Sequence, residues 1–331
     1  MQRTIRRFLP VSLCLLPILL SAQAWTPPKG EGMLMVTYQN QYTSDHLDGY
    51  NGRFRAGTIR LQGVENMVDF GLTNKLAFTA AAPLVWGVYH GPDPHALPVD
   101  GGTYHGSFAD FSLGLRYNII SRPLVVTPFI LGGMPSHEYI HFAHSAIGTD
   151  VSSFTFGVSI GKQLRPFLPN AYIEGMTSYS IVQKTIGFRP NRNNLTLQFG
   201  YFLTKRLQLR ALTSCQVTHG GVDFPILNWA HGHPDTVIWH HHDAIENINY
   251  VNAGAGADFS LTRNIGLSST WTATAWGQLG HALNSGLTIG VNYMFSTPWA
   301  HQHMQMRAPN EVPGQTTGST QSAGGKDLPL R

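Results

Sequence analysis

The stretch SGLTIGVNYMF, residues 285–295, decides the fold. Its odd-numbered positions from Leu287 to Phe295 are all apolar, whereas Thr288, Gly290 and Asn292 stand between them. An apolar side chain at every second position puts all of them on one face of an extended chain, and a helix does not have that period. The stretch therefore predicts a β-strand with one apolar face and one polar face.

The same alternation recurs along the chain. Five further segments show it clearly, at 33–42, 108–118, 152–163, 194–202 and 247–261. Six weaker segments lie between them, at 58–70, 75–89, 124–134, 171–183, 207–218 and 265–277. The pattern predicts an all-β protein of about twelve strands, and an even number returns the chain to the side on which it started.

Two of the weaker segments are irregular. Ile59 and Leu61 stand at odd-numbered positions, whereas Val64, Val68 and Phe70 stand at even-numbered ones. A β-bulge near Gly63 would bring both halves onto one face, so we expect a bulge there. Pro83 has no N–H to donate to a neighbouring strand and is expected to end regular pairing in its segment.

The connections alternate in length. The short ones are 71–74, 119–123, 164–170, 203–206 and 262–264. The long ones are 43–57, 90–107, 135–151, 184–193 and 219–246, and the last connection, 278–284, is shorter. Short turns on one side and long loops on the other are typical of an antiparallel up-and-down transmembrane β-barrel. Three short turns repeat the phrase Leu-Thr-x-x-apolar, starting at Leu72, Leu203 and Leu261.

The composition agrees with a barrel in a membrane. Charged residues make up 12% of the chain, against ~25% in soluble domains. Beyond the N-terminal segment, no apolar run reaches the ~18 residues that a membrane-spanning helix needs. Aromatic residues end several strands on the same side, and they favour the boundary between lipid and water. These aromatic residues are Phe70, Tyr117, Tyr201, Phe259, Tyr293 and Phe295. Outer-membrane lipid is the expected partner.

Residues 1–24 have the pattern of a cleaved signal peptide. Arg3, Arg6 and Arg7 precede an apolar run, and the Ala-Gln-Ala site predicts cleavage after Ala24. Removing these three arginines lowers the count of Lys and Arg from 22 to 19, against 18 Asp and Glu. The exported protein is then almost neutral, which argues against nucleic acid as a partner.

Three regions follow from these patterns. Residues 1–24 are the signal peptide, residues 25–295 form the outer-membrane barrel, and residues 296–331 form a disordered or loosely docked tail. The tail is rich in Pro, Gly, Gln, Ser and Thr and does not alternate. The expected location is the outer membrane, and the sequence favours no particular oligomeric state.

Three phrases in the chain resemble a known family. They are WTPPKGEG at 25–32, GLTNKLA at 71–77, and Asp110-Phe111 followed by GLRY at 114–117. They are similar to the outer-membrane transporters of the MetA pathway of phenol degradation, and the resemblance covers most of residues 25–295. It implies a barrel that takes up aromatic or other small hydrophobic molecules. It offers no catalytic motif, and the tail lies outside it.

Charged residues of both signs fall at positions expected to face the lumen. They are Arg60, Glu65, Asp69, Asp110, Arg116, Glu174, Arg210 and Asp258. One interpretation is that they set the electric field of a pore and select its solute. The other is that they pair with one another and close a narrow lumen, because an unpaired buried charge is costly. The similar number of each sign favours pairing.

Histidine is unusually frequent, with 16 residues, most of them in or beside the expected long loops. Neighbouring imidazoles bind zinc, copper or nickel. The candidate metal ligands are His137, His141, His231, His233, His240, His241, His242 and Asp243. Two of them belong to HEYIH, residues 137–141, which matches the zinc motif H-E-x-x-H if it forms a helix. The alternative interpretation is polar loop histidines without a metal, and no cofactor is expected.

A hydrolase is the least favoured function. GVSIG, residues 157–161, has the letters of a nucleophile elbow, but it lies inside an alternating strand, where Ser159 is expected to face the lumen. We therefore expect no enzyme. The leading hypothesis is passage or uptake of a small hydrophobic or aromatic molecule. The alternative is a closed binding barrel with histidine-rich loops.

Overall fold

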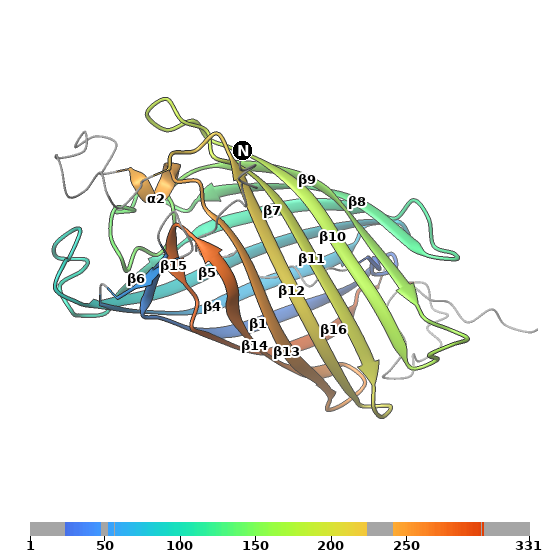
Figure 1. Cartoon of the computed structure of the whole chain (residues 1–331). Helices are drawn as coiled ribbons and strands as arrows, with labels where there is room; N and C mark the ends of the chain where they lie inside the picture. The colour runs from blue at the N-terminus through green and yellow to red at the C-terminus, as the bar shows by residue number, and fades with distance from the viewer. Residues whose placement is uncertain (1–23, 48–51, 56, 224–240, 299, 301–331) are drawn as a thin grey trace, which may run out of the picture.

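The computed structural model describes residues 24–47, 52–55, 57–223, 241–298 and 300. They form a closed antiparallel β-barrel of twelve strands, which confirms the predicted fold class (Figure 1). The wall consists of β1 (Glu31–Thr43), β4 (Thr58–Gly71), β5 (Leu76–His90), β6 (His105–Phe108) with β7 (Asp110–Tyr117), β8 (Val125–Pro135), β9 (Ser153–Gln163), β10 (Ala171–Val182), β11 (Asn191–Phe202), β12 (Leu207–His219), β13 (Asn249–Ser260), β14 (Ile265–Gln278) and β16 (Ser285–Ser296).

The barrel closes between its first and last strands. β1 pairs with β16 from Glu31 opposite Ser296 to Tyr42 opposite Ser285. All other neighbours in the wall are consecutive in the chain, as an up-and-down barrel requires. Among the described residues, no helix is both long and apolar enough to cross a membrane.

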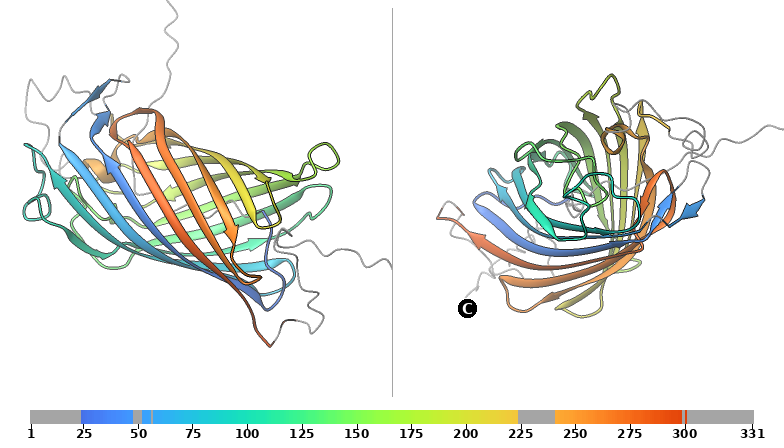
Figure 2. Two further views of the ribbon diagram at one scale, coloured as in Figure 1. Left: turned by 90° about the horizontal axis from the view of Figure 1, so that it is seen from below. Right: turned by 90° about the vertical axis from the view of Figure 1, so that its left-hand side faces the viewer.

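The two ends of the barrel differ, and we call them the short-turn end and the loop end. Five tight connections and the start of β1 gather at the short-turn end, whereas the long loops gather at the loop end (Figures 1 and 2). The loop end also carries a small sheet of β2 (Asp45–Leu47), β3 (Arg53–Phe54) and β15 (Gly280–Ala282) and the short helix α2 (His242–Ile245). The sequence did not predict these short elements.

The repeated Leu-Thr phrase explains three of the tight turns. The Thr73 hydroxyl oxygen accepts hydrogen bonds from the backbone N–H groups of Lys75 and Leu76. Thr204 and Thr262 accept the corresponding pairs of bonds in their own turns. A threonine hydroxyl thus satisfies N–H groups that leave the sheet, which is why the same residue recurs at the same place.

The outer wall exposes the apolar side chains that the alternation predicted. Leu287, Ile289, Val291 and Tyr293 are all exposed, and residues of the same parity on the other strands continue the surface. The aromatic rings at the short-turn end also point outward, and the rings of Phe70 and Phe295 stack there with their centroids 6.1 Å apart. An exposed apolar belt of this extent is a surface for lipid.

The predicted bulge at Gly63 is wrong. The register runs without a shift through Gly63 on both sides of β4, opposite Gln39 and opposite Val85. Ile59 and Leu61 instead face inward and are buried with Tyr89. Their apolar side chains lie inside because the loop end of the lumen is filled with protein. In this part of β4 the apolar positions therefore face the lumen, whereas farther along the strand they face the lipid.

Arg60 is therefore misassigned in the list of lumen residues. It lies on the outer face of β4, is exposed, and its guanidinium carbon lies 5.9 Å from the centroid of the Tyr42 ring. The alternation expected from a water-filled lumen put Arg60 inside. The apolar filling of the loop end reverses that assignment.

Pro83 marks an interruption of pairing, as expected, although β5 continues beyond it. Pairing of β5 with β7 ends at Ala81 opposite Ser112, and pairing with β6 begins at Leu84 opposite Phe108. Ala109 lies between β6 and β7 and donates its N–H to the Pro83 carbonyl oxygen over 2.9 Å. One additional residue on the partner strand thus makes a bulge opposite the proline.

Candidate functional site

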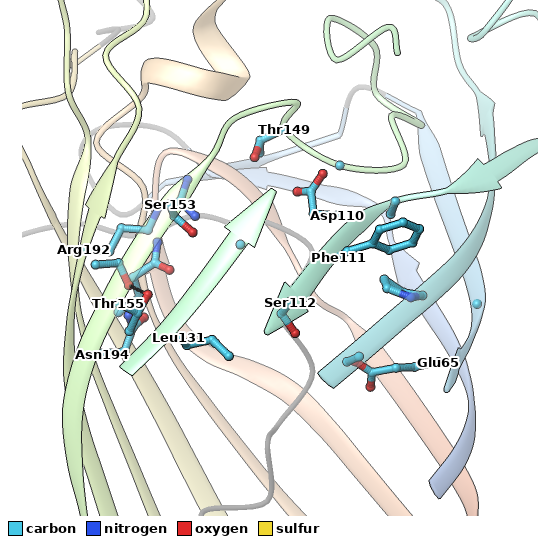
Figure 3. Close-up of a pocket in the computed structure, with 18 of the residues that line it drawn as sticks. Glu65, Asp110, Phe111, Ser112, Leu131, Thr149, Ser153, Thr155, Arg192 and Asn194 are labelled. Atoms are coloured by element: carbon cyan, nitrogen blue, oxygen red, sulfur yellow. Dashed lines mark hydrogen bonds between the residues drawn. The ribbon is translucent and has the colours of Figure 1, made fainter. Parts of the chain in front are cut away.

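The candidate functional site is a cavity of about 220 Å³ inside the barrel (Figure 3). Along β4, Glu65 lines it, whereas Asp69 lies nearer the short-turn end; along β10, Met176 lines it, whereas Glu174 lies nearer that end. The loop residue Ile147 lines it from the loop end. The cavity therefore lies in the middle of the lumen with protein on both sides of it.

Charged side chains are few among the residues that line the cavity, and they lie on opposite walls. Figure 3 shows Glu65 and Asp110 on one side and Arg192 with Asn194 on the other. The Tyr139 hydroxyl donates a hydrogen bond to Asp110, whereas no ion pair or hydrogen bond joins Glu65 to another described residue. The cavity thus offers a few polar contacts to a bound molecule.

Much of the cavity surface is apolar, although hydroxyl and amide side chains also line it. Phe111, Phe129, Leu131, Val151 and Ile147 are among the lining residues. The site therefore combines apolar surface with polar side chains and three charged groups, a combination that suits small organic molecules with a polar substituent.

Arg192 is a cavity residue that the sequence did not predict. β11 begins at Asn191, three residues before the segment expected from its alternation. Extending that strand would have put Arg192 on the face of Asn194, Thr196 and Gln198, which face the lumen. The strand start was missed because Asn191 and Asn193 carry no apolar signal.

Two ion pairs lie on the inner wall toward the short-turn end. Arg116 pairs with Asp69, and both side chains are almost fully buried. The Arg210 Nε atom lies 2.7 Å from an Asp258 carboxylate oxygen. These four predicted lumen residues thus face inward and pair along the wall. Arg210 and Asp258 lie on adjacent strands, and only β5 lies between the strands of Asp69 and Arg116, so neither pair spans the lumen.

The residues before β1 lie inside the same end of the barrel. In the unprocessed chain, Ala24 donates its backbone N–H to the Glu174 carboxylate and accepts a hydrogen bond from the Thr127 hydroxyl through its carbonyl oxygen. Cleavage after Ala24 would remove these two contacts and leave Trp25 as the first residue. The Trp25 ring packs edge-on against Tyr172 with centroids 5.9 Å apart. Gly161 leaves the space for it, because a Cβ there would lie 2.6 Å from Trp25. The N-terminal segment therefore enters the short-turn end of the barrel, and Trp25 is the residue that would stay there after cleavage.

The loop between β8 and β9, residues 136–152, closes the opposite end. The Asp100 carboxylate accepts hydrogen bonds from the backbone N–H groups of His144 and Ser145 and from the Ser145 hydroxyl. Ile147 is buried against Val85 and Ala109. Seen from this end, the loops lie across the ring of strands (Figure 2). They turn inward and fill the mouth of the barrel.

Five histidines gather at this end of the barrel, one of them, His144, in the loop itself. We call them the histidine cluster: His46, His95, His144, His242 and His281. Burial, and then the neighbouring histidines, lowers the pKa of His46 to about 4. Burial likewise lowers the pKa of His95, His144 and His281 below the ordinary value. These four rings are therefore uncharged at neutral pH, which leaves their nitrogen lone pairs available.

The predicted metal ligands are only partly brought together. His242 and Asp243 lie with His95 in a group whose ligand atoms are all within 4.8 Å of one another. The ring centroids of His241 and His141 lie 5.4 Å apart. The His141 Nδ1 atom lies 3.8 Å from a carboxylate oxygen of Asp150. Neither they nor His137 belong to such a group within the described residues. His231, His233 and His240 lie outside the described residues.

Two motif predictions have clear outcomes. Residues 137–141 are not helical, and His137 contacts Ser107 and Ser136, so the H-E-x-x-H geometry does not form. Ser159 lies within β9, faces the lumen and is buried, as its strand pattern predicted. The strand–turn–helix elbow that a serine nucleophile needs is therefore missing at Ser159.

Comparison with known proteins places the fold among outer-membrane barrels. No family model and no curated protein matches the sequence. An outer-membrane channel from Pseudomonas putida F1 matches with a TM-score of 0.63 and 12% identity, over 82% of this chain and 98% of that one. At this identity the match shows the fold alone, and this fold agrees with the one that the family resemblance implied.

Two other solved structures are less similar. The translocator domain of the autotransporter NalP from Neisseria meningitidis has a TM-score of 0.46 and 12% identity, over 81% of this chain and 89% of that one. The NanC porin has a TM-score of 0.45 and 10% identity, over 80% of this chain and 99% of that one.

Proposed function

We propose that this chain is an outer-membrane barrel that passes a small, mainly apolar molecule the size of a single substituted ring. The observation that supports it most directly is the cavity of about 220 Å³ inside a barrel with an apolar outer belt. The solved barrel of most similar fold reported above is itself an outer-membrane channel. In outer-membrane barrels the short turns face the periplasm and the long loops face the exterior, and we assign the two ends of this barrel in the same way.

The volume of the cavity sets the size of the solute. An apolar cavity of about 150 Å³ accommodates benzene, and the cavity here is moderately larger, at about 220 Å³. Leu131, Phe129 and Val151 supply the apolar contacts, and Glu65 or Arg192 would orient one polar substituent. A monocyclic aromatic alcohol has this chemistry.

Passage would need movement at both closures. On the exterior side the loop 136–152 would have to leave the mouth, and on the periplasmic side Trp25 would have to leave Tyr172. A barrel in which neither movement occurs would be a binding protein, and the closure at both ends favours this as the second candidate. Binding and passage are therefore measured separately.

The test uses adjacent residues on β7 that face opposite ways. Ser112 lines the cavity, whereas Leu113 is exposed on the outer wall. Full-length protein is placed in vesicles with lipopolysaccharide in the outer leaflet, which slows unaided entry of apolar solutes. Uptake of benzyl alcohol is measured, with calorimetric binding to the detergent-purified barrel in parallel.

The proposal expects saturable binding and uptake by the unmodified protein. Ser112→Trp should abolish both, Leu113→Trp should leave both unchanged, and Trp25→Ala should raise uptake several-fold by opening the periplasmic side. Binding without uptake, also in Trp25→Ala, would favour the binding barrel. Equal behaviour of the two tryptophan variants would refute the cavity as the site.

We also propose that export removes residues 1–24. N-terminal sequencing of protein from the outer-membrane fraction should begin at Trp25. An unprocessed N-terminus, or protein found only in the periplasm, would contradict the assignment. The tail from residue 301 lies outside the described residues, and its looseness stays a prediction that limited proteolysis would test.

A further inference from the structure

Three imidazoles from three separate loops converge at one point in the histidine cluster. The His46 Nε2 and His144 Nδ1 atoms lie 3.4 Å apart, and His144 Nδ1 lies 3.4 Å from His281 Nε2. The third side of this triangle, from His281 Nε2 to His46 Nε2, is 2.9 Å. His46 and His144 are buried and His281 is partly buried.

These separations match those of ligands on a single metal ion. Zinc–nitrogen bonds measure about 2.0–2.1 Å, so two nitrogens at a tetrahedral angle lie ~3.4 Å apart and two at a right angle ~2.9 Å apart. The His46–His144 and His144–His281 separations have the first value, and the His46–His281 separation has the second. The triangle is already the right size for an ion.

Hydrogen bonds among the three rings cannot satisfy this arrangement. Each ring nitrogen of a neutral imidazole carries either a hydrogen or a lone pair. Of three nitrogens that face one another, at least two must therefore be alike, which sets two hydrogens or two lone pairs against each other. A bound cation removes this conflict, because all three nitrogens can then present lone pairs to it.

The orientation of His144 suits a ligand. Its Nε2 atom lies 3.0 Å from the Asp93 carbonyl oxygen, which only accepts, so Nε2 carries the hydrogen and Nδ1 presents its lone pair to the triangle. A ligating histidine usually donates its other N–H to such an acceptor, which fixes the ring. Tyr89 stacks on the same ring with centroids 4.3 Å apart.

Space for a further ligand adjoins the triangle. A cavity of about 50 Å³ is lined by His144, His281, His141 and Asp243. A water molecule occupies about 30 Å³ in the liquid, so a water fits there as the fourth ligand. Three protein nitrogens and a water make a common four-coordinate site.

We propose that His46, His144 and His281 bind one divalent transition-metal ion of the zinc type, and that this ion ties three loops together over the exterior mouth of the barrel. His46 belongs to β2, His281 to β15, and His144 to the inserted loop 136–152. The residues are 98 and 137 positions apart along the chain. The ion would therefore cross-link parts of the chain that only the fold brings together.

The first experiment measures zinc binding to the full-length barrel in detergent after treatment with a chelator. We expect one Zn²⁺ per chain, and loss of this binding in both His144→Ala and His281→Ala. His219→Ala is the matched control, because His219 is an exposed histidine at the same end that contacts Asn193 instead. Binding in this control should equal that of the unmodified protein.

Heat-modifiable gel migration shows whether each variant keeps a closed barrel. If an alanine variant fails to fold, His46→Asn replaces the ring by a smaller polar side chain, and it should fold but bind zinc much more weakly. Cobalt gives a second measurement, since four-coordinate Co²⁺ has a strong visible absorption. That absorption should appear with the unmodified protein and vanish with His46→Asn.

Several outcomes would overturn the proposal. They are less than one ion bound by the unmodified protein, unchanged binding in both alanine variants, and binding lost only when His231, His233 and His240 are replaced together. The tying of the loops has its own readout: zinc should slow hydrogen exchange at residues 143–149. Exchange that zinc leaves unchanged would refute the loop cross-link.

Discussion

The two ends of the lumen are closed by different means. At the short-turn end, Arg116 pairs with Asp69, and the N-terminal segment packs its Trp25 ring against the wall. At the loop end, an inserted loop is held by Asp100 and by apolar packing of Ile147, and uncharged histidines lie above it. The ion pair at the short-turn end lies within the strands, beside the N-terminal segment, whereas the closure at the loop end is made by loops laid over the strands.

This difference has a consequence for stability. An interaction between strands can be lost only with the wall, so breaking it should affect unfolding of the whole barrel. A loop can leave its place while every strand stays paired, so breaking a loop contact should affect only local opening. We therefore expect the exterior closure to open first, and the four variants that follow test this from the largest effect to the smallest.

Asp69→Ala should have the largest effect. It removes the Asp69 carboxylate from the buried ion pair with Arg116, and removing one member of a buried ion pair costs about 3–5 kcal/mol. The free energy of unfolding of the whole barrel, measured by urea titration in detergent, should fall by that amount. The double variant Asp69→Leu/Arg116→Met should recover most of it. A double variant as unstable as Asp69→Ala would show that the charge left on Arg116 is not the cause of the lost stability.

Asp100→Ala should come next and should act locally. It removes the acceptor of hydrogen bonds from the N–H groups of His95, His144 and Ser145, and hydrogen bonds to charged groups contribute about 1.5–3 kcal/mol. Hydrogen exchange at 143–149 should accelerate while urea unfolding of the barrel stays nearly unchanged. Asp100→Asn keeps one acceptor oxygen and should lie between. An equal fall in global stability would contradict the distinction between the two ends.

Ile147→Val is a smaller probe of the same loop. It removes one buried methylene group from the contact with Val85 and Ala109, which typically costs about 0.5–1.5 kcal/mol. Exchange at 143–149 should rise modestly, and benzyl alcohol uptake should rise with it if loop opening limits passage. The matched variant Ile289→Val lies on the lipid-facing surface and should change neither. Faster exchange with constant uptake would mean that another step limits passage.

Arg53→Ala should have the smallest effect. An Arg53 guanidinium nitrogen lies 3.4 Å from an Asp45 carboxylate oxygen, but the Arg53 side chain is 42% exposed. Exposed ion pairs contribute at most about 1 kcal/mol to the free energy of unfolding. Neither urea unfolding nor exchange at 143–149 should change measurably. A loss comparable to that of Asp69→Ala would show that charge pairs at the loop end also stabilise the wall.

The sequence predicted the wall in detail because strand alternation is local. Whether a residue faces lipid or lumen depends mainly on its neighbours two positions away, so Leu287 to Phe295 reveal their face without knowledge of the rest of the fold. Turn chemistry is equally local, as Thr73 and its two counterparts show. The number of strands, the closed barrel wall and the inward direction of seven of the eight proposed lumen charges could therefore be predicted from the sequence.

The tertiary structure alone decided what fills the lumen. Arg60 was misplaced because Ile59 and Leu61 point into a mouth filled by a loop that begins 75 residues later. The joining of His46, His144 and His281 is equally invisible in the sequence, since separations of 98 and 137 residues carry no periodic signal. Alternation assigns each side chain to a face of the wall, but what meets it inside depends on loops that arrive from elsewhere in the fold.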